Sequence, residues 1–148
     1  MISITNLTAN SIDKSFFEKI AKLILKGEKK SEEISIVLIG PAKMRKLNKQ
    51  YLGKNRTTDV LSFAKVQPLE FKFPPGKEKE LGEIVICLRE VRKNTKRLKS
   101  IFGTELARVL IHGILHLSGY NHEKSEKEAK KMQEKENYYL KIWQNPIS

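Results

Sequence analysis

The three histidines of this 148-residue chain all lie within eleven residues, as His112, His116 and His122. On a helix, residues four apart leave the same face, so His112 and His116 are expected to present their rings one turn apart. Gly119 stands where a helix can end in a left-handed turn, because glycine has no Cβ to clash there. The chain can then fold back and deliver His122 to the same place. Three neutral imidazoles hold a divalent metal ion, zinc above all, and leave a fourth position open, so the spacing favours a catalytic metal site over histidines gathered by chance.

The residue that follows the first histidine argues against a protease. Metzincin proteases share this histidine spacing, but they carry a glutamate directly after the first histidine as the general base of peptide hydrolysis. Here that position is Gly113, which neither accepts nor donates a proton through a side chain. Glu105 lies two helical turns before His112 and is too far along the axis to replace the missing base. The sequence therefore predicts metal-assisted chemistry whose other groups come from elsewhere in the chain.

Apolar periodicity predicts the elements that must position the histidines. Strands are expected at residues 2–7, 33–39, 60–64 and 81–87, and helices at residues 11–27, 41–52, 88–99, 104–117 and 125–143. Residues 65–79 contain three prolines and a glycine and are expected to form a loop. Four strands and about five helices predict a single domain over residues 1–148. We expect an α+β fold in which helices cover a mixed sheet.

The charge is strongly basic, with 29 Lys and Arg against 17 Asp and Glu and a net charge of +12. This excess favours a polyanionic partner, with nucleic acid ahead of an anionic membrane surface. Residues 41–58 contain six basic residues and no acid, and residues 89–99 contain six basic residues and one acid. The candidate nucleic-acid contacts in these two segments are Lys46, Lys49, Arg56, Arg89 and Arg92. Basic helix faces are also common as solvated surface, so that alternative stays open for each segment.

Several features of the sequence indicate where in the cell the chain acts. A single cysteine, Cys87, excludes an intrachain disulfide framework and any zinc site built from several cysteines. No apolar run approaches the roughly 18 residues of a membrane-spanning helix. The first ten residues lack the pattern of a signal peptide. We therefore expect a cytoplasmic protein without a membrane partner.

Three blocks of the sequence resemble the YbeY family. Residues 112–122 are similar to its H-G-x-L-H-L-x-G-Y-D-H signature, with Asn121 where the family usually has aspartate. Residues 56–63, R-T-T-D-V-L-S-F, resemble its R-x-T-D-V-L-S-F block, and residues 81–86, L-G-E-I-V-I, resemble its L-G-D-I-x-I strand. Because the blocks follow one another in the family's order over a chain of matching length, the chain is identified as a member of that family.

The resemblance implies a zincin-like α+β fold and a single-strand-specific, metal-dependent endoribonuclease that acts in ribosomal RNA maturation. It implies 16S rRNA 3′-end processing and ribosome quality control, with RNA, the ribosome and ribosomal or other RNA-processing proteins as partners. It also implies that His112, His116 and His122 hold one divalent metal ion, usually taken as zinc, and that Arg56 and His112 belong to the catalytic site. A guanidinium suits that role, because it can hold two phosphate oxygens while charge develops on them.

Two positions keep a plainer interpretation beside the catalytic one. Arg56 is also explained as an ordinary loop arginine, and Asp59 as a turn acceptor that holds the same loop.

Asn121 retains hydrogen bonding but lacks the charge of aspartate. If the family's aspartate orients a ligand histidine, this chain is expected to hold its metal less tightly than its relatives do.

Two other functions remain open from the sequence alone. The chain is also explained as a noncatalytic, metal-stabilised ribosome assembly factor, or as a metal-dependent hydrolase of another substrate. The open fourth metal position favours an enzyme. The lack of an obvious protein base favours an assembly factor.

Overall fold

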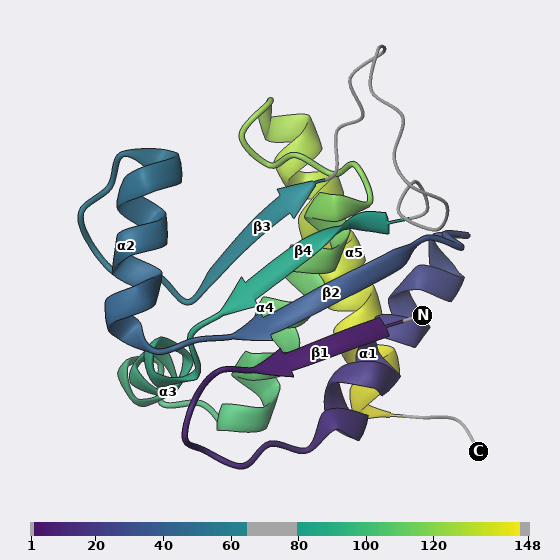
Figure 1. Cartoon of the computed structure of the whole chain (residues 1–148). Helices are drawn as coiled ribbons and strands as arrows, with labels where there is room; N and C mark the ends of the chain where they lie inside the picture. Colours follow the sequence, from purple (N-terminus) through teal and green to yellow (C-terminus); the bar gives the residue numbers. More distant parts are fainter. Residues whose placement is uncertain (1, 65–79, 146–148) are drawn as a thin grey trace.

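The computed structural model describes residues 2–64 and 80–145, which form four strands and five helices (Figure 1). The strands are β1 (Ile2–Asn6), β2 (Glu33–Leu38), β3 (Val60–Ala64) and β4 (Glu80–Ile86). The helices are α1 (Lys14–Gly27), α2 (Pro41–Leu52), α3 (Leu88–Arg97), α4 (Phe102–Leu117) and α5 (Glu126–Gln144). The predicted α+β class is confirmed, while the loop expected at 65–79 lies outside the described residues. None of the described helices is both long and apolar enough to cross a lipid bilayer.

The four strands form one mixed sheet in the order β1-β2-β4-β3. The first three strands are parallel, and β3 pairs with β4 in the antiparallel direction at the edge of the sheet. Side chains alternate between the two faces of a strand, so Ile84 and Ile86 join one apolar cluster and Val85 joins the other. The larger cluster lies between the sheet and the helices α1, α4 and α5, which are behind the sheet in Figure 1.

Helix α4 is the central element of this arrangement. It contacts α1, α3 and α5 as well as β3 and β4. Leu110, Ile111 and Ile114 are completely buried. On the other face of the sheet, α2 packs through Met44 against the smaller cluster. The residues that carry the candidate chemistry therefore begin on the best-packed helix of the domain.

The helix ends follow from local hydrogen bonds that apolar spacing does not report. The side chain of Asp13 accepts a hydrogen bond from the Ser15 N–H, so α1 begins at Lys14 and not at residue 11. Ser125 caps α5 in the same way through the Glu128 N–H. Helix α3 ends two residues earlier than expected, and Lys99 has a positive φ of 53°.

Gly113 brings α4 unusually close to the sheet. A Cβ atom at this position would lie 3.1 Å from Ile84 Cγ2 and 3.2 Å from Ser62 Oγ. The Ser62 hydroxyl donates a 3.4 Å hydrogen bond to the Gly113 carbonyl across the same contact. The position that carries a general base in metzincins thus faces packed strands, where a glutamate side chain has no room.

This contact predicts that Gly113→Ala destabilises the fold although alanine favours helix. Overpacking costs about 1–3 kcal/mol against an intrinsic helix gain of up to about 1 kcal/mol, so the free energy of unfolding should fall. Gly103 is the matched control, because it also lies in α4 and a Cβ there meets nothing within 4 Å. Urea denaturation of both variants measures the difference. A loss for Gly113→Ala no larger than that for Gly103→Ala would contradict the close approach.

Candidate metal centre

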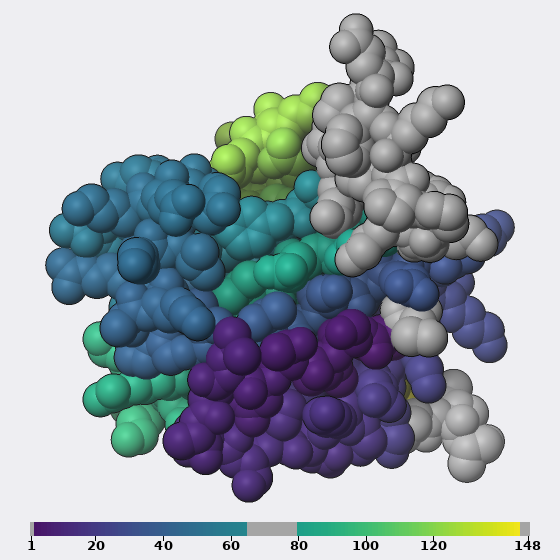
Figure 2. Space-filling model, viewed as in Figure 1, coloured from purple at the N-terminus to yellow at the C-terminus, as the bar shows by residue number. Residues whose placement is uncertain are grey.

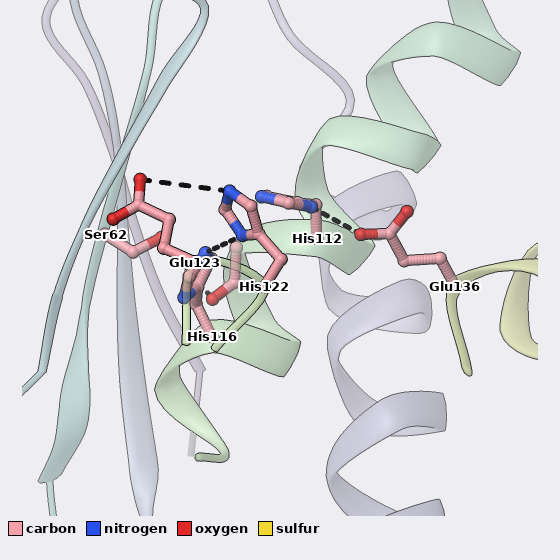
Figure 3. Close-up of polar contacts among 7 residues, drawn as sticks. Ser62, His112, His116, His122, Glu123 and Glu136 are labelled. Carbon is pink, nitrogen blue, oxygen red and sulfur yellow. Dashed lines mark hydrogen bonds and ion pairs between the residues drawn. The ribbon is translucent and has the colours of Figure 1, made fainter. Parts of the chain in front are cut away.

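The structure brings the three histidines together as the spacing predicts. One candidate ligand atom from each of His112, His116 and His122 lies within 4.8 Å of the others. The ring centroids are 4.9 Å apart for two of the pairs and 5.3 Å apart for the third. Figure 3 shows the rings turned toward one another, with Nε2 of His116 3.0 Å from Nδ1 of His122. Two nitrogens that bind one ion at about 2.0–2.1 Å lie at most about 4.2 Å apart. The pair at 3.0 Å fits this limit directly, and a separation of up to 4.8 Å needs to close by less than about 1 Å.

The turn after α4 delivers the third histidine. Gly119 has a φ of +111°, a value that an L side chain rarely adopts. The Gly119 N–H donates to the His116 carbonyl at 3.1 Å, and the Tyr120 N–H donates to the Leu115 carbonyl at 3.1 Å. This pair of bonds is a Schellman motif, which satisfies the last carbonyls of the helix while it reverses the chain. The predicted role of Gly119 is confirmed.

A largely buried carboxylate fixes the segment that carries His122. Glu28, at the end of α1, accepts hydrogen bonds from the hydroxyls of Tyr120, at 2.8 Å, and of Tyr139. Lys135 Nζ lies 3.5 Å from the same carboxylate. Although burial raises the pKa of Glu28, the hydrogen bonds from both tyrosines and the nearby Lys135 ammonium together hold that pKa below its usual value. Burial and the Glu28 carboxylate raise the pKa of Tyr120 to about 12, so its hydroxyl stays protonated and donates.

The carboxylate that contacts a candidate ligand histidine is Glu136 of α5. Its Oε1 atom meets Nδ1 of His112 in a short hydrogen bond (Figure 3). Because a carboxylate only accepts, His112 donates through Nδ1 and keeps Nε2 free for a metal ion. Carboxylates in this position orient ligand histidines and make them more basic. Asn121 serves the turn, since its side-chain oxygen accepts the Glu123 N–H at 3.0 Å.

Sequence reasoning missed Glu136, which lies 24 residues after His112. One signal was available in the pattern of α5. Met132 and Leu140 are buried, and Glu136 lies four residues from each on the same helix face. A lone acid on a buried stripe needs a partner, and His112 supplies it.

The surroundings of His116 favour its neutral form. Burial, followed by the neighbouring rings of His112 and His122, lowers the pKa of His116 below its usual value of 6.5. A neutral imidazole is the form that binds metal ions, so the lowered pKa extends metal binding toward acid.

The structure fixes the backbone at Arg56 and leaves its side chain free. Asn48, 2% exposed, donates from its side chain to the Arg56 carbonyl at 2.9 Å. Within the described residues, the exposed guanidinium makes no hydrogen bond or ion pair. Three residues later, Asp59 accepts from Thr58 Oγ1 at 3.4 Å and from Asn94 Nδ2 at 3.3 Å. These contacts fit the plainer interpretation of Asp59 as a loop acceptor.

The candidate RNA contacts fall in different places. Lys46 and Lys49 are exposed on α2, and Arg89 is exposed at the start of α3. The Arg92 guanidinium lies 4.9 Å from the Phe102 ring centroid, in a hollow between α1, α3 and α4 that contains no histidine.

Two other arginines share a hollow with one of the candidate metal ligands. Arg97 and Arg108 line a hollow of about 300 Å³ together with His112 and Glu136. Arg97 belongs to the basic segment at residues 89–99, whereas the sequence offered no signal for Arg108.

A second hollow gives access to the histidines. It has a volume of about 430 Å³, extends along β3, and contains His112 and His116 in its wall. A ligand in this hollow reaches two of the three candidate metal ligands. The site is therefore open to substrate on the β3 side.

Comparisons with known proteins agree with the three sequence blocks. The family model described as Endoribonuclease YbeY matches residues 3–144. The chain belongs to the YbeY family. The Endoribonuclease YbeY of Persephonella marina is 41% identical over 123 residues, which cover 82% of this chain and 78% of that relative. The Aquifex aeolicus relative of the same name is 36% identical over 138 residues, with 93% and 88% covered.

A solved structure extends the YbeY match to the fold. The solution structure of TM1509 from Thermotoga maritima aligns with a TM-score of 0.66 and 30% sequence identity, covering 99% of this chain and 94% of that chain. The YbeY family is metal-dependent, and the three imidazoles of this chain have the donor chemistry for a metal ion.

Removing the charge of Glu136 should weaken metal binding without abolishing it. Glu136→Gln is expected to lower the metal affinity by about 10- to 100-fold, because it replaces the carboxylate that orients His112. Glu123→Gln is the control, since Glu123 Oε1 lies 4.0 Å from His122 and its side chain is 83% exposed, against 17% for Glu136. Competition with a chromogenic chelator gives both dissociation constants. Equal affinities for the two variants would remove Glu136 from the metal centre.

Proposed function

We propose that this chain is a single-strand-specific, metal-dependent endoribonuclease that acts in ribosomal RNA maturation. The observation that carries the proposal is the open three-histidine cluster in a chain of the YbeY family. The hollow beside His112 and His116 supports it, because a substrate can reach the cluster there. The relatives named above are called endoribonucleases, which favours an enzyme over a noncatalytic assembly factor or a hydrolase of another substrate.

The proposed cofactor is one zinc ion per chain, held by His112, His116 and His122. Three imidazole nitrogens with no thiolate match the ligands of catalytic zinc, and the single cysteine, Cys87, is buried in the apolar cluster around α2. A bound zinc ion supplies Lewis acidity toward phosphate oxygens and water. The chain's own residues orient the histidines, through Glu136 for His112 and through the turn at Gly119 for His122.

Arg56 is the proposed catalytic cation. The bond from Asn48 anchors its backbone, and its exposed guanidinium is available to a phosphodiester. Two parallel N–H groups would then hold the oxygens on which charge develops. Arg89, Arg92, Lys46 and Lys49 are proposed to contact the RNA backbone, with the α2 lysines on the helix that ends at the hollow.

The proposed cellular role follows from the family. Residues 1–148 are proposed to form a single domain that acts in the cytoplasm. The proposed reaction is the processing of the 3′ end of 16S rRNA. Ribosome quality control and contacts with the ribosome or with other RNA-processing proteins belong to the same proposal. The basic charge of the chain supports a partner rich in phosphate.

Cleavage of a single-stranded RNA should require both the metal ion and Arg56. Chelation or His116→Ala is expected to abolish cleavage, whereas Arg56→Ala should lower the rate by about 10²- to 10³-fold at unchanged metal content. Arg56→Lys should rescue poorly, because an ammonium lacks the planar fork of a guanidinium. Gel assays on metal-loaded variants measure the rates. Full activity of Arg56→Ala would overturn the catalytic role of Arg56. Full activity in the presence of chelator would overturn the role of the metal ion.

The lysines of α2 should determine how RNA binding depends on salt. Each neutralised phosphate of a single strand contributes about 0.7 to the slope of log affinity against log salt. The double variant Lys46→Ala and Lys49→Ala is therefore expected to flatten that slope by up to about 1.4. Lys127→Ala with Lys130→Ala is the control, since α5 alternates lysine and glutamate. Titrations at three salt concentrations measure both slopes, and equal slopes would show that RNA binds elsewhere.

A further inference from the structure

An exposed aromatic residue stands at the far end of the hollow that contains the histidines. The hollow runs from His112 and His116 along β3 to Tyr51 and Leu52, the last residues of α2. Tyr51 and Leu52 are each 57% exposed. Figure 2 shows α2 standing out beside the sheet, with β3 at the bottom of the hollow between α2 and the segment that follows α4. Large apolar side chains are thus presented to solvent next to the candidate metal centre.

The Tyr51 ring is held in place before any ligand arrives. It packs edge to face against Phe63 of β3, with ring centroids 5.1 Å apart and an interplanar angle of 63°. Phe63 itself packs against the smaller apolar cluster. The two rings also line a second hollow of about 330 Å³ on their other side, so they form a wall between two open spaces. A ring supported on one edge and open elsewhere loses little freedom when a flat group stacks on it.

The charge around this ring indicates what stacks there. Residues 41–58 carry six basic residues and no acid, and Lys46 and Lys49 are exposed on the helix that ends with Tyr51 and Leu52. Proteins that bind single-stranded nucleic acid combine a basic track for phosphates with aromatic rings on which bases stack. The positive charge would contribute little to the binding of an extended peptide along β3, because a peptide backbone carries no net charge.

We propose that Tyr51, supported by Phe63, stacks an unpaired base of single-stranded RNA while the neighbouring phosphate occupies the histidine end of the hollow. This inference rests on the proposed RNA substrate and adds a base-binding subsite to it. Bases in a duplex are already stacked and paired, so a subsite of this kind selects single strands by shape. Every base has a flat face, so the subsite tolerates any sequence.

The test compares a short single-stranded RNA with an abasic strand of the same length and charge. Both bind through phosphates, so the ratio of their dissociation constants reports the bases alone. Wild-type protein is expected to prefer the RNA, and Tyr51→Ala should lose about 5- to 100-fold of affinity for it. The affinity of the same variant for the abasic strand and for duplex RNA should stay within twofold of wild type.

Tyr138→Ala is the matched control for Tyr51→Ala. Tyr138 is 56% exposed and packs edge to face on Tyr139 with the same 5.1 Å between centroids, but it lies on α5 beside a different hollow. Its loss should leave RNA affinity unchanged. Tyr51→Phe keeps the ring and should bind like wild type. Tyr51→Leu keeps the apolar packing on Phe63 without a ring, and it should bind like Tyr51→Ala even if the alanine variant fails to fold.

The outcomes separate this subsite from the proposed activity. Metal-dependent cleavage with an RNA affinity that Tyr51→Leu leaves unchanged would overturn the subsite alone. A Tyr51-dependent preference for RNA over the abasic strand, without any cleavage, would support the subsite and overturn the nuclease. Equal losses for RNA, the abasic strand and duplex RNA would also overturn the subsite, because they would show that Tyr51 acts through the fold.

Discussion

The close contact between α4 and the sheet at Gly113 is the constraint on which the candidate site depends. Because no side chain separates the helix from Ile84 and Ser62, α4 lies against the strands directly beside His112. Because α4 also packs into the core, its two histidines have little freedom to change position. The same contact prevents the helix from carrying a metzincin-like glutamate at residue 113. The chain therefore relies on groups from other elements for any further catalytic role.

Two carboxylates outside the histidine motif complete the arrangement. Glu136 of α5 orients His112, and Glu28 at the end of α1 secures the segment before His122 through Tyr120. Both carboxylates are largely removed from solvent. An unpaired charge in such a position costs free energy, so each carboxylate needs its hydrogen-bond partners. The helices that bury the core thus also determine where the histidine nitrogens lie. The packing of the helices and the placement of the three histidines are coupled through these two acids.

Much of this structure was predictable because its signals are local. Helical spacing places His112 and His116 together, and the freedom of Gly119 allows the turn to His122. Alternating apolar residues predict the strands, and the mixed sheet follows from their order with the helices. The blocks around Arg56 and the histidines are sufficient to suggest the family.

The remaining features depend on contacts between distant segments, which one sequence does not report. Glu28 and Tyr120 are 92 positions apart, and Glu136 is 24 positions from His112. The exposed pair Tyr51 and Leu52 looks like ordinary helix packing until the hollow beside it is seen. Helix α1 begins three residues later than expected because Asp13 caps it, and α5 begins one residue later because Ser125 caps it.

The central claim is that three imidazoles from one packed helix and its following turn hold a single metal ion. X-ray absorption spectroscopy on protein loaded with zinc, combined with metal analysis, tests it most directly. The account predicts one zinc ion per chain with three imidazole nitrogens at about 2.0–2.1 Å and one further light-atom ligand. A sulfur ligand at about 2.3 Å would contradict it, as would fewer than three imidazoles or a zinc content well below one per chain.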